Sequence, residues 1–190
     1  RGEPANGAHR VLTIVTGGIG GALGLMALTV ELPISTTLML RSIADIARNE
    51  GEHITDVQTK LACLEVFALG GTSHADDGVD TGYFAVRAAL AGAMTEAAKY
   101  LVEHGITGSG APALVRFLSK IATRYSIQVS EKAAAQAIPL LGAAGGATIN
   151  LLFMDHFQNM ARGHFIVRRL ERAHGKESVR DAYRQFAARN

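Results

Sequence analysis

The sequence predicts an all-α protein: a single multi-helix domain with two central glycine-rich apolar helices that form a pseudo-repeat. Apolar residues recur at intervals of three and four along most of the chain, and no stretch alternates with period two over a useful length. Two long segments, residues 11–30 and 133–154, carry no charged residue. Apolar residues make up 48% of the chain and charged residues 19%, against about 25% charged in an average soluble domain.

The N-terminal part divides into a tail and two helices. Residues 1–9 are polar, contain Gly and Pro, and indicate a tail or linker remnant before a helical domain over residues 10–190. The uncharged residues 11–30 predict the first apolar helix. Pro33 suits the first turn of a second helix, which Gly51 is expected to end.

Two further helices follow. Thr55 and Gln58 have the spacing of a capping box, which predicts a helix that begins near Asp56 and ends at residues 70–71. An alanine-rich pattern over residues 79–104 predicts a long helix closed by Gly105.

The C-terminal half contains four expected segments. Pro112 can start a helix, and Ser130 is expected to open the second uncharged segment, which Pro139 should kink or split. Two short helices are predicted next, one around residues 165–174 and one from Ser178, where apolar residues form one face.

The two uncharged segments match each other when residues 17–22 are placed over residues 142–147. Glycines three and four apart lie on one helical face and allow another backbone to approach closely. We therefore expect the two segments to pack together as a helix-packing pair. The glycines concerned are Gly17, Gly20, Gly21 and Gly24 in the first segment, and Gly142, Gly145 and Gly146 in the second.

The polar residues that end these apolar segments are the candidate site. A carboxylate beside long apolar stretches is costly unless it is paired, so Glu31 should meet a basic partner near Asp155 and His156. One interpretation is a buried ion-pair cluster that fixes helix register. The other is an acid/base or metal site, with His156 as the proton-transfer group and Glu31 or Asp155 orienting it. The remaining members of the expected polar cluster are Arg41, Asp45, Arg162 and His164.

Several familiar motifs are excluded. The apolar run into Gly17 resembles a dinucleotide-binding turn, but Leu23 stands where the third glycine of that motif belongs, and no series of strands follows. Phosphate-loop, zinc-protease and serine-hydrolase motifs do not occur in the sequence. We therefore predict no cofactor and no metal, and the sequence leaves open whether the protein is an enzyme. The single cysteine, Cys63, lies in an apolar run and is expected to be a buried structural thiol.

The C-terminal end is basic. Residues 162–190 contain eight Lys or Arg and three acids, a net charge of +5, so the rest of the chain carries −3. Such an end can face anionic lipid headgroups or simply be a solvated helical face. Nucleic acid is not expected as a partner, because the arginines lack interleaved aromatic residues. The arginines predicted to face headgroups are Arg168, Arg169 and Arg172.

Three stretches carry a family resemblance: residues 30–48, 61–70 and 145–165. Together they are similar to the EcsC family of bacterial proteins, over about residues 10–185. The resemblance implies a helical bacterial protein on the cytoplasmic side of the membrane, named after a gene beside an ABC-transporter operon. It brings no catalytic residues with it. Members usually carry a further helical N-terminal portion, which we expect to be absent from this chain.

These observations leave three functional hypotheses. The first is a helical protein in peripheral or conditional association with the cytoplasmic face of the inner membrane, as a transporter-linked accessory whose partners are an anionic membrane surface or a membrane protein. The second is a hydrolase or metal-dependent enzyme centred on Glu31, Asp155 and His156. The third is a homo-oligomeric or partner-binding module. Whether the glycine helices span a bilayer or form a soluble core stays open.

Overall fold

The structure is a computed structural model that describes residues 25–69, 81–105, 112–136 and 142–187. These residues form six α-helices and one short 3₁₀ helix, with no strand among them, so the all-α prediction is confirmed. The elements are α2 (Leu25–Asn49), α3 (Val57–Glu65), η1 (Val66–Ala68), α4 (Thr81–His104), α5 (Pro112–Gln136), α6 (Gly142–His174) and α7 (Lys176–Ala187).

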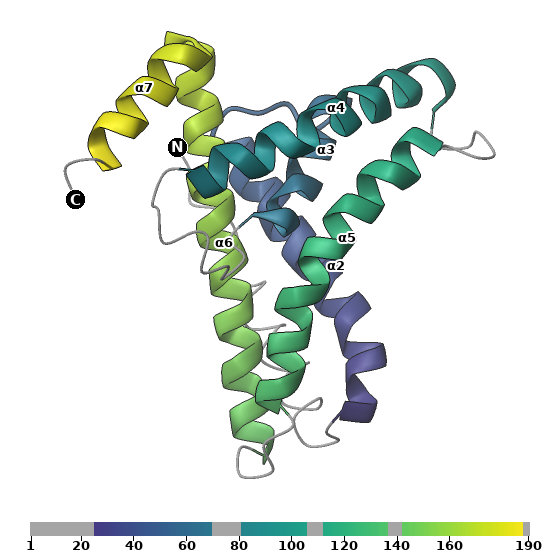
Figure 1. Cartoon of the computed structure of the whole chain (residues 1–190). Helices are drawn as coiled ribbons and strands as arrows, with labels where there is room; N and C mark the ends of the chain where they lie inside the picture. Colours follow the sequence, from purple (N-terminus) through teal and green to yellow (C-terminus); the bar gives the residue numbers. More distant parts are fainter. Residues whose placement is uncertain (1–24, 70–80, 106–111, 137–141, 188–190) are drawn as a thin grey trace.

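The long helix α6 organises the molecule. Its first part runs beside α2 and α5 in a three-helix stem, as Figure 1 shows. Near its C-terminal end α6 meets the head, where α4 crosses above α3 and η1 (Figure 1). The last helix, α7, turns back at Gly175 and packs on α6. The C-terminal half of α6 therefore lies among elements from both halves of the chain.

An aromatic cluster joins the stem to the head. Phe67 of η1 lies between two helices, with its ring centroid 5.2 Å from that of Phe157 on α6 and 5.1 Å from that of Tyr125 on α5. Phe153 packs edge-on against Phe157 at 5.1 Å. Phe157 has no exposed surface, and burial of side chains of this size is the main favourable term in folding.

Two polar contacts inside the apolar interface set the register of the stem. The amide nitrogen of Gln158 donates a hydrogen bond of 2.9 Å to the hydroxyl oxygen of Ser42, and both side chains are buried. The hydroxyls of Thr36 and Tyr125 lie 2.9 Å apart. Because a buried polar group without a partner is costly, these pairs favour one alignment of α2 with α6 and α5.

The helix ends predicted from glycine and proline are confirmed, whereas one predicted cap is wrong. Gly51 and Gly105, the predicted stops, have φ angles of +81° and +68°, which place them in the left-handed region that favours glycine. Pro112 is the first residue of α5. The third helix starts after Asp56 as expected, but the predicted capping box is wrong, because the N-cap is Asp56 and no side-chain hydrogen bond caps it.

Two predicted helix boundaries are also wrong. Pro33 does not open a helix, since α2 is continuous from Leu25 through it to Asn49. Residues 165–174 are not a separate short helix but the end of α6. Gly163 inside α6 costs only about 1 kcal/mol relative to alanine, and α6 packs extensively against α2, α5, η1 and α7. Tertiary packing therefore keeps α2 and α6 continuous at Pro33 and Gly163, residues that locally disfavour a helix.

A third boundary is wrong in the same way. Ser130 was expected to open the second uncharged segment, yet it lies within α5, which continues to Gln136. That segment is thus shared between the end of α5 and the start of α6 at Gly142. Pro139 lies outside the described residues.

The glycine pseudo-repeat stays a prediction. Gly17, Gly20, Gly21 and Gly24 lie outside the described residues, and Gly142, Gly145 and Gly146 are described only as helical backbone at the start of α6. Within the part of the chain that the structure describes, no helix combines the length and apolarity needed to cross a membrane.

We expect Phe157→Ala to lower the free energy of unfolding by about 3–5 kcal/mol, because it leaves a cavity at the centre of the aromatic cluster. Chemical denaturation followed by circular dichroism measures this. The matched control is Phe186→Ala, since Phe186 is 72% exposed and its removal should change stability by no more than about 0.5 kcal/mol. Equal effects of the two substitutions would contradict the proposed core.

Candidate functional site

Charged side chains converge where the last turns of α6 pass the α2–α3 connection. Glu52 lies in that connection and is 9% exposed. Its carboxylate accepts hydrogen bonds from Arg168 Nε at 2.9 Å, from Thr59 Oγ1 at 3.1 Å and from Arg172. Burial alone would raise the pKa of Glu52, but hydrogen bonds and charges from Arg168, Thr59 and Arg172 hold it below its usual value. Glu52 is therefore an ionised anchor for α6.

The neighbouring Glu50 strengthens this anchor. Arg169 Nη1 lies 2.6 Å from its carboxylate, and Arg172 Nη2 donates a hydrogen bond of 2.9 Å to its backbone oxygen. All three arginines predicted to face headgroups thus bind the α2–α3 connection, where Glu50 and Glu52 offset part of their charge. That these arginines face lipid headgroups stays a prediction.

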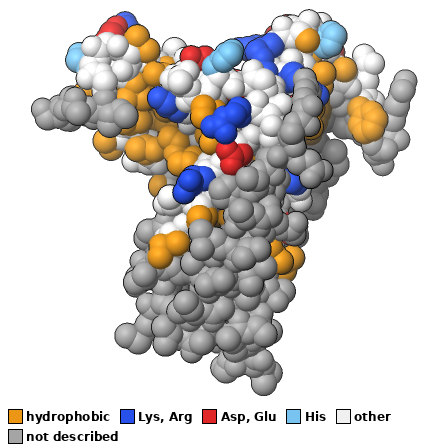
Figure 2. Space-filling model, turned by 180° about the vertical axis from the view of Figure 1, so that it is seen from behind, with side chains coloured by type: hydrophobic (Ala, Val, Ile, Leu, Met, Phe, Trp, Pro, Cys, Tyr) orange, Lys and Arg blue, Asp and Glu red, His pale blue; other side chains and the backbone are white. Residues whose placement is uncertain are grey.

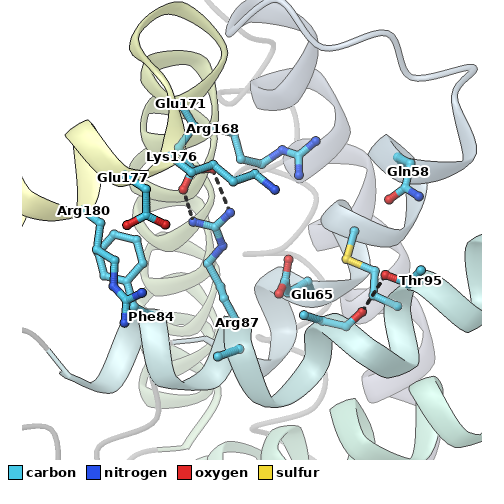
Figure 3. Close-up of a pocket in the computed structure, with 13 residues that line it drawn as sticks. Gln58, Glu65, Phe84, Arg87, Thr95, Arg168, Glu171, Lys176, Glu177 and Arg180 are labelled. Atoms are coloured by element: carbon cyan, nitrogen blue, oxygen red, sulfur yellow. Dashed lines mark hydrogen bonds and ion pairs between the residues drawn. The ribbon is translucent and has the colours of Figure 1, made fainter.

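A second ion pair ties α4 to α6. Arg87 donates two hydrogen bonds to Glu171, of 2.8 and 2.9 Å, in a bidentate arrangement (Figure 3). The guanidinium carbon of Arg87 also lies 5.3 Å from the ring centroid of Tyr83 and 5.9 Å from that of Phe84. A bidentate pair fixes the relative orientation of its two side chains as well as compensating their charges. The Arg87–Glu171 pair therefore holds α4 and α6 in a fixed arrangement.

A tyrosine, a histidine and a glutamate form a buried row below this wall. The Tyr83 hydroxyl lies 3.0 Å from Nδ1 of His164, and Nε2 of His164 lies 3.7 Å from Oε2 of Glu65. The side chains of His164 and Glu65 are 0% and 4% exposed. Nε2 of His164 has no hydrogen-bond partner among the described residues, because 3.7 Å is longer than a hydrogen bond.

The protonation states of this row differ from those of exposed groups. Burial raises the pKa of Glu65 to about 7, against the opposing charges of Arg87 and Arg168. Burial, together with the charges of Arg87 and Arg168, holds the pKa of His164 well below its usual value. Near neutral pH the imidazole is therefore neutral, and Glu65 can exchange between its protonated and ionised forms, which suits a group that gives or takes a proton.

Glu65 opens on one side to a pocket. Residues from α3, α4, α6 and α7 line this open pocket, which has a volume of about 340 Å³ (Figure 3). Its charged lining consists of Glu65, Arg87, Arg168, Glu171, Lys176, Glu177 and Arg180. The remaining wall includes Phe84, Ala88 and Met94. The pocket thus combines an apolar side with several cations and a titratable carboxyl.

Neither Asp155 nor His156, two of the predicted central residues, lines this pocket. The side chain of Glu31 is not described, although its backbone belongs to α2. Asp155 and His156 lie half-buried on α6, where the His156 ring packs on Phe157 with centroids 5.2 Å apart. The predicted convergence of Glu31 with Asp155 and His156 stays a prediction.

The predicted polar cluster is spread along α2 and α6. Arg48 Nη1 donates a hydrogen bond of 3.0 Å to Asp45, and Arg162 Nη1 donates one of 2.8 Å to Asn159. Arg41 is exposed. Only His164 belongs to the buried row described above.

The sequence analysis did not predict Tyr83 or Glu65 as site residues, although the sequence contains one indication of Glu65. Glu65 is the single charged residue within the apolar residues 61–69, and an isolated acid in such a run is expected to be buried or functional. Nothing local in the sequence points to Tyr83, since its contact with His164 joins residues far apart in the chain.

The described residues offer no evident metal site. The described residues include no group of three or more His, Cys, Asp or Glu side chains that could hold a metal ion. Cys63 is buried, as predicted, and burial raises the pKa of its thiol to about 12. A thiol in this state is a poor nucleophile.

Removal of the anchor should be costly at neutral pH. We expect Glu52→Gln to destabilise the protein by about 1.5–3 kcal/mol at pH 7, the contribution typical of hydrogen bonds to charged groups. Because the pKa of Glu52 is lowered, its contribution is present above the unfolded pKa of about 4.5 and lost as the pH falls further. Urea denaturation at pH 7 and pH 4 should show a smaller difference at pH 4. Asp181→Asn, at an exposed ion pair with an N–O distance of 3.6 Å, should have little effect at either pH.

Glu65→Gln should have the opposite pH dependence. The raised pKa of Glu65 means that its contribution to stability is fully present below about pH 4.5 and is lost as the pH rises through about 7. The wild type should therefore lose up to about 3 kcal/mol of stability relative to Glu65→Gln between these values. Denaturation midpoints over a pH series measure this, with the exposed Glu96→Gln as control. Parallel curves for wild type and Glu65→Gln would rule out a raised pKa.

A family model agrees with the resemblance noted in the sequence. The model of the EcsC protein family matches residues 2–170, which include α2 to α5 and most of α6 but not α7. No curated protein and no solved structure matches the chain significantly. Because the match covers most of the chain, the protein belongs to the EcsC family.

Proposed function

We propose that the protein works at an anionic membrane surface, docked from the cytoplasmic side as an accessory to a membrane protein. The observation that carries this proposal is the character of α7. Lys176, Arg180 and Arg184 are spaced by four residues and form one exposed stripe. The exposed ring of Phe186 lies on the same helix. A short helix that combines basic residues with an exposed aromatic ring suits the interface between lipid headgroups and acyl chains.

The packing of α7 leaves Phe186 available. Val179 is buried against the body of the protein, and the Tyr183 ring packs on Phe84 with centroids 5.2 Å apart. These two residues hold α7 in place, whereas Phe186 is 72% exposed. An anchored helix can therefore present one aromatic side chain and several cations without first refolding.

The available charge makes the proposed binding reversible. Glu50 and Glu52 already offset part of the charge of the arginines at the end of α6. Each remaining basic residue near an anionic surface contributes about 1 kcal/mol, and one aromatic ring adds a comparable amount. These magnitudes suit peripheral, salt-sensitive association, and stable anchoring would require a partner protein as a second attachment.

A self-assembling or partner-binding role is the second candidate, and a separate surface supports it. Val102, Val115 and Leu118 are 74%, 59% and 40% exposed on α4 and α5. Hydrophobic side chains gather on the upper left of Figure 2, at the end of the molecule where α4 and α5 meet. Apolar residues gathered on one surface suit contact with another protein. The hydrolase hypothesis gains no comparable support, since neither Asp155 nor His156 lines the pocket of the buried row.

Vesicle flotation tests the membrane proposal. We expect the protein to float with vesicles rich in phosphatidylglycerol at low salt and to be released at high salt, because charge screening weakens surface attraction. Arg184→Gln with Phe186→Ala should weaken binding at least about tenfold, since it removes one cation and one aromatic ring. Neither residue lines the pocket.

The control is Val115→Ala with Arg116→Gln, which makes a comparable change on exposed positions of α5. This variant should bind vesicles as the wild type does. If the wild-type protein stays unbound at low salt with anionic vesicles, the proposal is wrong. Equal loss in both double variants would also contradict a specific role of α7.

A further inference from the structure

We propose that the pocket between α3, α4, α6 and α7 is a binding site for a small phosphate monoester, held by Lys176 and Arg180 with Glu65 at its floor. This inference goes beyond docking at a membrane surface, since it concerns a cavity. It shares Lys176 and Arg180 with the basic stripe of α7, whereas the membrane test changes Arg184 and Phe186, which do not line the cavity. It rests on three features of the pocket: cations without partners, a one-sided buried carboxyl and an apolar wall of suitable size.

The cations come first. Lys176 and Arg180 line the pocket from adjacent turns of α7, and no described residue forms an ion pair with either. In Figure 3 the Lys176 side chain extends over the Arg87–Glu171 pair. Arg87 pairs with Glu171, and Arg168 pairs with Glu52. Besides Glu65, the remaining charged side chains of the lining are the cations Lys176 and Arg180 and the carboxylate Glu177. A phosphate monoester carries a charge of about −1.5 to −2 at pH 7, which the two cations attract although Glu177 offsets part of their charge.

Glu65 supplies the second feature. It is 3% exposed and lines the pocket, yet no described residue donates a hydrogen bond to its carboxyl. On the side away from the pocket, Oε2 of Glu65 lies 3.7 Å from Nε2 of His164. A protonated carboxyl on the floor can donate a hydrogen bond to a phosphate oxygen, whereas an ionised one would repel it. The ligand therefore completes a hydrogen bond that the protein leaves open.

The pocket's size and apolar wall set the class of ligand. A volume of about 340 Å³ is near the lower end of the range of about 300–1,000 Å³ for ligand sites. Phe84, Ala88 and Met94 form an apolar side, which suits the carbon part of an ester better than inorganic phosphate alone. The same chemistry occurs in a soluble metabolite and in a phosphatidic acid headgroup, and experiment separates these sources.

Ligand affinity should depend on pH through Glu65. The groups that face or flank it are Arg87, Glu171, Arg168, His164, Tyr83, Lys176, Glu177 and Arg180. Arg87 and Arg168 are compensated by carboxylates, and His164 is neutral because burial lowers its pKa. Glu65 is therefore the group that titrates near neutrality, and its ionisation above about pH 7 should weaken the binding of an anion.

Isothermal titration calorimetry on the full chain tests the site. We use glycerol 3-phosphate as the phosphate monoester and a sulfate monoester, whose charge is constant, for the pH series. Wild type should bind both, and Lys176→Gln with Arg180→Gln should weaken binding at least about tenfold. Arg184→Gln, on the same stripe of α7 but outside the pocket, should bind as wild type does. Glu65→Gln should bind the sulfate ester with an affinity that does not change between about pH 6 and pH 8, whereas wild-type affinity falls.

Competition identifies the source of the ligand. Vesicles containing phosphatidic acid that displace glycerol 3-phosphate, where phosphatidylglycerol vesicles do not, would assign the site to a lipid headgroup. Displacement by the soluble ester alone would assign it to a metabolite. The absence of binding by the wild type overturns the proposal. So does equal affinity in Lys176→Gln/Arg180→Gln and Arg184→Gln, or binding of acetate but not of the phosphate and sulfate esters. None of these results depends on whether Phe186 contacts a membrane.

Discussion

The compensation of one buried carboxylate determines how the C-terminal half of α6 lies on the protein. Glu52 is 9% exposed and would be costly to bury alone. Arg168 and Arg172 supply its partners from one face of α6, one turn apart. Because both arginines must reach the α2–α3 connection, α6 has to continue as a helix beyond the stem. The same stretch carries His164 and Glu171 into the head, so the position of the pocket depends on this anchor.

The cations of the basic C-terminal end consequently fall into two groups, according to whether a carboxylate of the protein pairs with them. Three arginines at the end of α6 form ion pairs within the protein. Arg168 and Arg172 pair with Glu52, and Arg169 pairs with Glu50. The cations of α7 have no such partners among the described residues, apart from the exposed pair of Arg184 with Asp181. Net charge read from the sequence does not separate these groups. The structure separates them: the arginines at the end of α6 are paired with carboxylates, whereas most cations of α7 remain available for a partner.

Features set by neighbouring residues could be predicted from the sequence, and features set by distant contacts could not. Gly51, Gly105 and Pro112 mark helix ends through their own backbone preferences, so their roles were read correctly. Continuity of α2 across Pro33 was missed, because packing of α2 on α6 outweighs a local break. Within the candidate site, His164 could be picked out as polar, but its partners Tyr83 and Glu65 come from other helices.

Glu52, which precedes α3, and Glu65, which is the last residue of α3, differ in their partners, so one is an anchor and the other a group that responds to pH. Glu52 accepts several hydrogen bonds from cations and a hydroxyl, so its ionised form is favoured and stabilises the fold at neutral pH. Glu65 is buried more deeply, and the nearby Arg87 and Arg168 are bound to other carboxylates. Its ionised form is therefore disfavoured, and a carboxyl at this place stabilises the fold less at neutral pH than a neutral residue would. An anion bound in the pocket would raise the pKa of Glu65 further and couple ligand uptake to proton uptake, which a purely structural side chain could not do.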